Sequence, residues 1–146
     1  MRRLLLLCAL ALVATGASAQ IPGFRKRGAE QPVLTGIDAA RADFVTKSGG
    51  DTVFFGLNSA ILSPPARTIL ALQAQWIRQH PEVVVRIEGH GDAGDTRDHA
   101  LAMGARRAEG VRDYLVLLGV PAAQLGATTM GKERPGAPRA VTILVR

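Results

Sequence analysis

Cysteine and aromatic residues are scarce in this chain of 146 residues. Its one cysteine, Cys8, lies inside an apolar run at the start of the chain, so we expect no disulfide framework in the folded part. Aromatic residues make up 4% of the chain, so the core must be built mainly from Ala, Val, Leu and Ile. After this first run, no apolar stretch is long enough to cross a bilayer.

The chain also lacks a basic block interleaved with aromatic residues, although its formal net charge is +6 at pH 7. We therefore do not expect it to bind nucleic acid. A modest excess of positive charge suits an anionic cell-wall polymer, and it equally suits a solvated basic surface. Hydrophobic residues at 47% and charged residues at 21% are enough for a packed core, and the length favours one domain.

The first residues have the pattern of a secretory signal peptide. A basic start at Arg2 and Arg3 precedes the apolar run of residues 4–13, and Ala17-Ser18-Ala19 is a small-x-small cleavage site. An uncleaved anchor is the alternative, but the run is shorter than the roughly 20 residues of a spanning helix. We expect residues 1–19 to be a cleaved signal peptide, residues 20–50 a tether with a short helix at 37–47, and residues 51–146 the folded domain.

The remaining sequence predicts strands and helices in the order β-α-β-α-β-β. Apolar residues alternate in the segments 82–88 and 139–145, as they do in half-buried strands. Between Leu101 and Leu118 they recur at spacings of three and four, as on one face of a helix that Thr96 can cap. This order predicts an α/β (α+β) fold, a two-layer sandwich in which both helices cover one face of a mixed sheet. The expected elements are strand 52–55, helix 64–80, strand 82–88, helix 97–118, strand 127–131 and strand 139–145.

Two charged residues, Asp92 and Arg107, lie where the second strand turns into the second helix. Asp92 is flanked by Gly91 and Gly94, which let the backbone turn and let a ligand approach closely. Arg107 lies about three turns into the helix, and its side chain can point back towards residues 90–95, the turn that we call the corner. A carboxylate and a guanidinium at one cleft suit a ligand that carries an ammonium and a carboxylate. The spacing leaves open the alternative that Asp92 and Arg107 simply pair with each other.

Other chemistries fit the sequence less well. His90, Asp92 and His99 resemble half of a metal site, but nothing completes a ligand set at the usual spacing, so we expect neither a metal nor another cofactor. No nucleophile lies on a tight strand-to-helix elbow. Glu88 and Asp92 could form a carboxylate pair, but neither lies in an evident apolar pocket. We therefore expect a binding protein and not an enzyme.

Several segments carry a resemblance to a known family, namely VFFGLNSAILSPPAR, IEGHGDAGDTRDHALAMGARRA, VRDYLVLLGVPAAQL, MGKERP and PRAV. From residue 52 to the end, the chain resembles the OmpA C-terminal-like domain family and looks closest to its peptidoglycan-associated lipoprotein branch. The most specific segment is Gly89-His90-x-Asp92, followed by Leu101 and Arg106-Arg107-Ala108. The resemblance implies non-catalytic binding of peptidoglycan through the diaminopimelate of its stem peptide. Asp92 would hold the amine of that residue, and Arg107 would hold its carboxylate.

The resemblance also implies a location and a set of partners. It implies a periplasmic protein that is associated with the outer membrane and helps to link the cell envelope to the wall. Its implied partners are peptidoglycan and proteins of the Tol system or the outer membrane. At the ligand site, the resemblance implies contributions from Asn58, Leu101 and Arg139 beside the two charged residues.

The sequence departs from the family pattern around the expected site. The family's Phe-Asp-x-Asp/Asn is here Phe55-Gly56-Leu57-Asn58, and its Tyr-Asn at the start of the second helix is His99-Ala100. The segment before the last strand is short, Arg139 alone remains of an arginine pair, and the lipidated cysteine of the lipoprotein branch has no counterpart. We expect weaker or altered binding to the wall. The alternative is a degenerate module that binds an envelope protein such as TolB in place of the wall.

Overall fold

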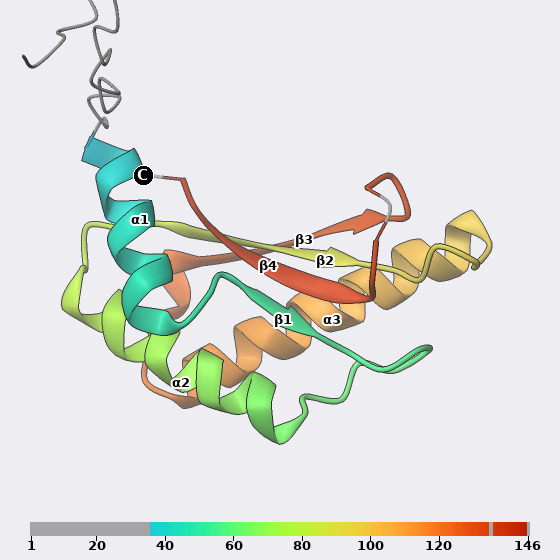
Figure 1. Cartoon of the computed structure of the whole chain (residues 1–146), viewed down its shortest axis with the longest axis horizontal. Coiled ribbons are helices and arrows are strands. Elements are labelled where there is room, and N and C mark those ends of the chain that lie inside the picture. The colour runs from blue at the N-terminus through green and yellow to red at the C-terminus, as the bar shows by residue number, and fades with distance from the viewer. Residues whose placement is uncertain (1–35, 135, 146) are drawn as a thin grey trace, which may run out of the picture. The chain divides into compact units, whose positions relative to one another are not determined.

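The computed structural model describes residues 36–134 and 136–145 (Figure 1). The predicted signal peptide and residues 20–35 of the predicted tether lie outside the described residues, so both stay predictions. The described elements are α1 (Gly36–Ser48), β1 (Thr52–Phe54), α2 (Pro64–Gln79), β2 (Val85–His90), α3 (Arg97–Leu117), the 3-10 helix η1 (Ala122–Gln124), β3 (Leu125–Gly131) and β4 (Arg139–Leu144).

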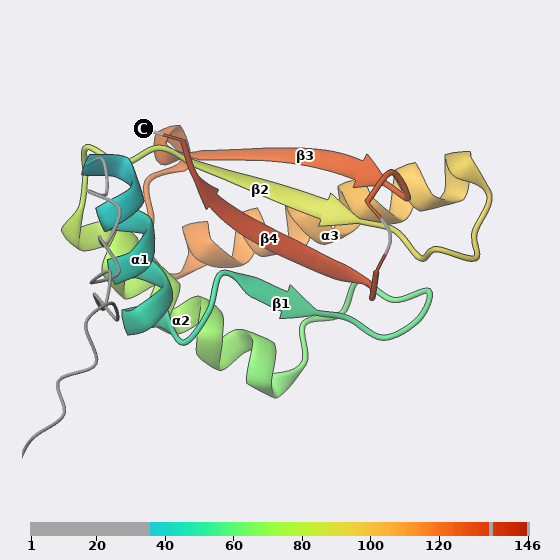
Figure 2. The ribbon, with the colours of Figure 1, turned by 45° about the horizontal axis from the view of Figure 1, so that its top comes forward.

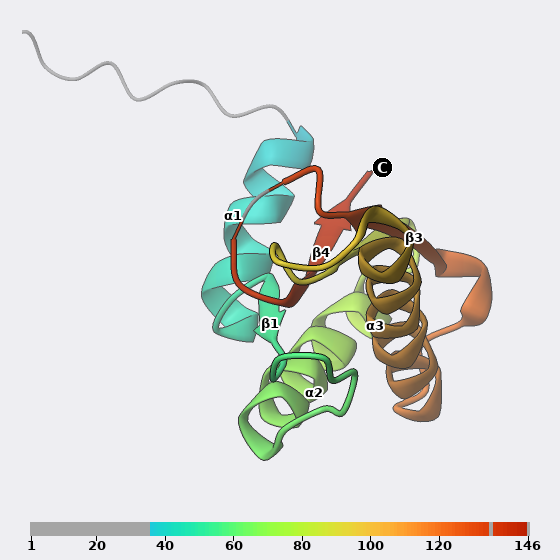
Figure 3. The ribbon, with the colours of Figure 1, turned by 90° about the vertical axis from the view of Figure 1, so that its right-hand side faces the viewer.

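The strands form one mixed sheet in the order β1-β4-β2-β3. Strand β2 runs parallel to β3 and antiparallel to β4, and β4 is antiparallel to β1. Helices α2 and α3 cover one face of this sheet (Figures 2 and 3). The predicted two-layer α/β sandwich is therefore confirmed, with its order β-α-β-α-β-β from β1 onwards and its mixed sheet.

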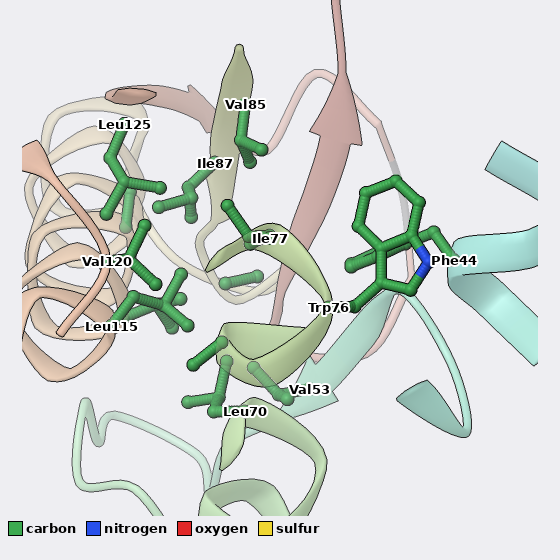
Figure 4. Close-up of a cluster of buried hydrophobic side chains, with 14 of the residues drawn as sticks. Phe44, Val53, Leu70, Trp76, Ile77, Val85, Ile87, Leu115, Val120 and Leu125 are labelled. Atoms are coloured by element: carbon green, nitrogen blue, oxygen red, sulfur yellow. The ribbon is translucent and has the colours of Figure 1, made fainter. Parts of the chain in front are cut away.

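Alternate residues of β2 and β4 point into the layer between the sheet and the helices. Val85 and Ile87 on β2 are buried there, and Leu144 on β4 is the register partner of Val85. A β-strand turns successive side chains to opposite faces, so the alternation in the sequence already marks these residues. The core that they form with the helices is shown in Figure 4, and it also contains Leu70, Ile77, Leu115, Val120 and Leu125.

Helix α1 is part of the folded domain, which corrects the predicted boundary at residue 51. The short helix expected at residues 37–47 is present, but it packs against the domain and does not form part of a free tether. Phe44 is buried and meets Trp76 of α2 edge-on, with 5.2 Å between ring centroids. Nε and Nη2 of Arg41 both donate to the carbonyl of Leu144, at 3.2 and 2.8 Å. The sequence gives little sign of this docking, because the apolar residues of the helix do not gather on one face.

The two ends of the domain carry different elements. Helix α1 lies at one end, and β2 ends at the other, where α3 begins (Figures 1 and 2). The predicted site, which directly follows β2, therefore lies at the end of the domain opposite to α1.

Among the helices that the structure describes, none combines the length and the apolar character that a membrane span needs.

Candidate binding site

The chain turns sharply between the end of β2 and the start of α3. Gly91, directly after β2, donates its N–H to the carbonyl of Gly131 on β3 at 2.7 Å. Thr96 is the N-cap of α3, and its hydroxyl accepts the N–H of His99 at 3.3 Å. These contacts fix Asp92 between the end of β2 and the first turn of α3.

Helix α3 packs so closely on β2 that only glycine fits at the contact. A Cβ atom on Gly89 would overlap the carbonyl oxygen of Gly104, and one on Gly91 would overlap the backbone of Ala100. A side chain at either position would push the helix away from the strand. The close approach brings Arg107, on the same helix, within reach of the end of β2.

Arg107 is fully buried, and all three nitrogens of its guanidinium are engaged. Nη1 lies 2.8 Å from Oδ1 of Asp92 and also donates to the carbonyl of His90 at 2.8 Å. Nε donates to the carbonyl of Ser59 at 2.8 Å, and Nη2 donates to that of Gly56 at 3.2 Å. Asp92 and Arg107 therefore pair with each other in this structure, which is the alternative that their spacing leaves open.

Asp92 is 6% exposed, and its carboxylate is held by two partners. Oδ1 pairs with Arg107, and Oδ2 accepts the backbone N–H of Asn58 at 2.6 Å. Burial acts to raise the pKa of Asp92, but the hydrogen bond from Asn58 and the pairing with Arg107 together outweigh it and hold the pKa below its ordinary value. The corner thus holds an ionised acid beside a guanidinium near neutral pH.

Asn58 joins the corner to the first turn of α3. Its φ of 49° lies in the left-handed region, which asparagine tolerates better than most residues. Its side-chain oxygen lies 2.9 Å from Nε2 of His99, and the same nitrogen lies 3.5 Å from Oδ2 of Asp95. Asn58 therefore contacts Asp92 through its backbone and His99 through its side chain.

The sequence model of the OmpA family matches residues 54–142, more than half of the chain and all of the corner. The chain belongs to the OmpA family. The family membership inferred from the sequence motifs is therefore confirmed, and the mixed sheet with its covering helices is the OmpA-like fold.

Several proteins similar to this OmpA-family chain are peptidoglycan-associated lipoproteins. The one from Mesorhizobium japonicum is 43% identical over 105 residues, which are 70% of this chain and 62% of that protein. The one from Brucella melitensis is 41% identical over 90 residues, which are 62% of this chain and 54% of that protein. The crystal structure of the one from Burkholderia pseudomallei matches with a TM-score of 0.65 and 30% identity, covering 70% of this chain and 100% of the other. The chain thus spans between 54% and 62% of the length of the first two relatives.

Two predicted site residues of this OmpA domain make their hydrogen bonds outside the network of the corner. Leu101 lies against Gly131, where an added Cβ would come within 2.9 Å of its Cδ2. The carbonyl of Leu101 accepts the hydroxyl of Thr129 at 2.9 Å. Arg139, at the start of β4, donates to the carbonyl of Ala137 at 3.1 Å. The network of the corner itself joins the other three predicted residues, Asn58, Asp92 and Arg107.

Sequence reasoning misses other members of the network. The carbonyl groups of Gly56 and Ser59 hold Arg107, but a backbone acceptor carries no signal in the residue type. The sequence marks His99 as part of half a metal site and as a departure from the family's Tyr-Asn, and not as a contact of Asn58. Within residues 36–134 and 136–145, no group of three or more His, Cys, Asp and Glu side chains could hold a metal ion. The polar contact of His99 with Asn58 depends on two segments that only the fold brings together.

Glu88, the other carboxylate considered from the sequence, has partners of its own. It is fully buried on β2, and its oxygens lie 3.0 Å from Nη2 of Arg86 and 2.9 Å from Nη1 of Arg134. Two half-exposed arginines thus hold one buried acid. Glu88 therefore fastens the segment after β3, which carries Arg134, to the sheet.

Proposed function

We propose that this domain binds peptidoglycan without catalysis, through the diaminopimelate of the stem peptide, and so helps to link the cell envelope to the wall. The observation that carries the proposal is the pair of Asp92 and Arg107, an ionised acid and a guanidinium held side by side. The names of the similar proteins support it, because they are called peptidoglycan-associated lipoproteins. A periplasmic location beside the outer membrane, after removal of the signal peptide, belongs to the same proposal.

A zwitterionic amino-acid group can replace both halves of the internal ion pair. Its ammonium would hydrogen-bond to the carboxylate of Asp92, and its carboxylate would take up the guanidinium of Arg107. Each charge-assisted contact contributes about 1.5–3 kcal/mol, and the loss of the internal pair offsets part of this gain. We therefore expect roughly micromolar affinity or weaker for one stem peptide, strengthened by the many copies in the polymer. Asn58, and further out Leu101 and Arg139, complete the proposed contacts.

Co-sedimentation with purified sacculi tests this proposal. We expect the wild-type protein to sediment with wall that contains diaminopimelate and not with wall of the lysine type. Asp92→Asn keeps the shape of the side chain but removes its charge, and it should weaken binding about tenfold or more, because one charge-assisted contact is lost. Asp92 is the better target than Arg107, because Arg107 also holds three backbone carbonyls.

The matched control is Asp113→Asn, which removes a carboxylate whose side chain is 71% exposed. It should sediment like the wild type. If a folded Asp92→Asn variant sediments as well as the wild type and the control, the proposed site is wrong. If the wild type sediments equally with both kinds of wall, diaminopimelate is not the ligand.

Two exposed apolar side chains favour a second candidate, the binding of an envelope protein. Leu57 is 80% exposed and Ile61 is 76% exposed, and they flank Asn58 on the segment that covers the corner. Exposed apolar residues grouped around a polar site are typical of protein interfaces. A partner captured from periplasm by both the wild type and Asp92→Asn, and lost when Leu57 and Ile61 are changed to serine, would favour this candidate over wall binding.

A further inference from the structure

Both charged groups of the proposed site are covered in this structure. Arg107 is fully buried and Asp92 is 6% exposed, so a ligand cannot reach the pair without a movement of what lies over it. The cover is the segment of residues 56–61, which we call the site loop. Its carbonyl groups at Gly56 and Ser59 accept from Arg107, and its backbone N–H at Asn58 donates to Asp92.

These three contacts of the site loop involve the charged pair itself. A ligand that binds Asp92 and Arg107 uses the same hydrogen-bonding groups, so its contacts replace the hydrogen bonds that the site loop loses. The contact between Asn58 and His99 is different, because neither side chain belongs to the charged pair. This contact is lost when the site loop moves away from α3, and a ligand at the charged pair forms no contact that replaces it.

His99 is well placed to hold the loop. It lies in the first turn of α3, where its N–H is bound by the Thr96 cap. Its Nε2 lies 2.9 Å from the side-chain oxygen of Asn58, and since that oxygen only accepts, Nε2 carries the hydrogen. The carboxylate of Asp95 lies 3.5 Å from the same nitrogen, on the side of the corner.

We propose that His99 is a positioning residue that latches the site loop over Asp92 and Arg107 and thereby limits access of the wall ligand. This inference rests on the proposed function of the pair. The latch predicts the direction in which binding changes when His99 is replaced. If His99 only supported a preformed site, its removal would weaken binding, whereas removal of a latch lowers the cost of opening and strengthens binding.

The test compares His99→Ala, which removes the donor, with His99→Gln, whose amide N–H can donate to the same oxygen. The probe is a soluble muropeptide that contains diaminopimelate, and its affinity is measured by calorimetry. One neutral hydrogen bond corresponds to about a two- to tenfold change in an equilibrium constant. We expect His99→Ala to bind about two- to tenfold more tightly than the wild type, and His99→Gln to bind like the wild type.

A second measurement reads the latch without any ligand. Hydrogen exchange at the backbone N–H of Asn58 follows the opening of the site loop, because that group is bonded to Asp92 when the loop is closed. We expect His99→Ala to speed this exchange about two- to tenfold and His99→Gln to restore the wild-type rate. Asp98→Ala, an exposed neighbour in the same helical turn, is the matched control and should leave the rate unchanged.

The outcomes separate the latch from the proposed function. If the wild type binds no muropeptide, the proposed function fails, and the exchange of Asn58 alone decides whether the latch exists. If His99→Ala leaves that exchange unchanged, there is no latch. If His99→Ala binds the muropeptide with equal or lower affinity than the wild type, His99 does not limit access and the inference is overturned.

Discussion

His90 is the residue whose environment fits its chemistry least well. Its side chain is buried at the end of β2, and within the described residues neither ring nitrogen has a hydrogen-bond partner. Burial lowers the pKa of His90, the positive charges of Arg139 and Arg134 lower it further, and Glu88 acts in the opposite direction. The imidazole is therefore held neutral in the folded domain.

We predict that the domain loses stability on mild acidification because of His90. The unfolded chain takes up this proton near the ordinary pKa of 6.5, whereas the folded domain takes it up only at lower pH. The contribution is thus fully present above that pH and is lost as the pH falls towards the folded pKa. The free energy of unfolding, measured in urea at about pH 7.5 and about pH 5.5, should fall with a slope of at most about 1.4 kcal/mol per pH unit from this group.

His90→Gln is the control, because glutamine does not titrate. We expect this variant to lose part of the slope between the two pH values. A variant whose slope equals that of the wild type would show that His90 does not take up a proton on unfolding.

At the scale of elements, the contact between β2 and α3 decides where the charged pair lies. Glycine at position 89 faces glycine at position 104, and the two backbones touch. Arg107 is fixed one turn further along the same helix, so a shift of α3 would change its distance from Asp92 and from the carbonyl of His90. Packing and site geometry are coupled here.

We predict that Gly89→Ala destabilises the domain by about 3 kcal/mol or more, because the new methyl group overlaps the backbone of Gly104 and neither strand nor helix can yield cheaply. Gly94→Ala is the matched control, because an added Cβ at Gly94 meets nothing within 4 Å. Urea denaturation measures both. Equal stability of the two variants would show that α3 shifts without cost.

The strands and helices could be predicted from the sequence because their patterns are local. Alternation in residues 82–88 and the spacing of apolar residues after Leu101 follow from the geometry of a strand and a helix. The closure of the corner could not be predicted, because the partners of Arg107 include backbone carbonyls from a distant loop. The docking of α1 could not be predicted either, because its apolar residues, with the buried Phe44 among them, do not gather on one face of the helix.

For the whole molecule, α1 enlarges the domain that the sequence suggested. Beyond the packing of Phe44 on Trp76, the indole Nε1 of Trp76 donates to Oδ2 of Asp43 at 2.8 Å. The side chain of Arg41 binds the last carbonyl of β4. Helix α1 thus joins the start of the described chain to its last strand.

We predict that Phe44→Ala lowers the free energy of unfolding by about 3–5 kcal/mol, because a buried aromatic side chain is removed from the core. Val45→Ala, at an exposed position of the same helix, should cost less than about 1 kcal/mol. A chain that begins at residue 51 should be at least as unstable as Phe44→Ala. If that shortened chain is as stable as the full one, α1 does not contribute to the fold.

Tension between the two ends of the domain would run along its strands. The chain passes from α1 directly into β1, and the corner directly follows β2. Both β1 and β2 run antiparallel to β4, which lies between them. A pull on α1 against a wall bound at the corner would therefore load the hydrogen bonds of both strand pairs together, in shear, and not one after another. Because the proposed ligand is held by few contacts, it would leave the corner before the sheet separates, so a strained attachment would release and rebind without unfolding the domain.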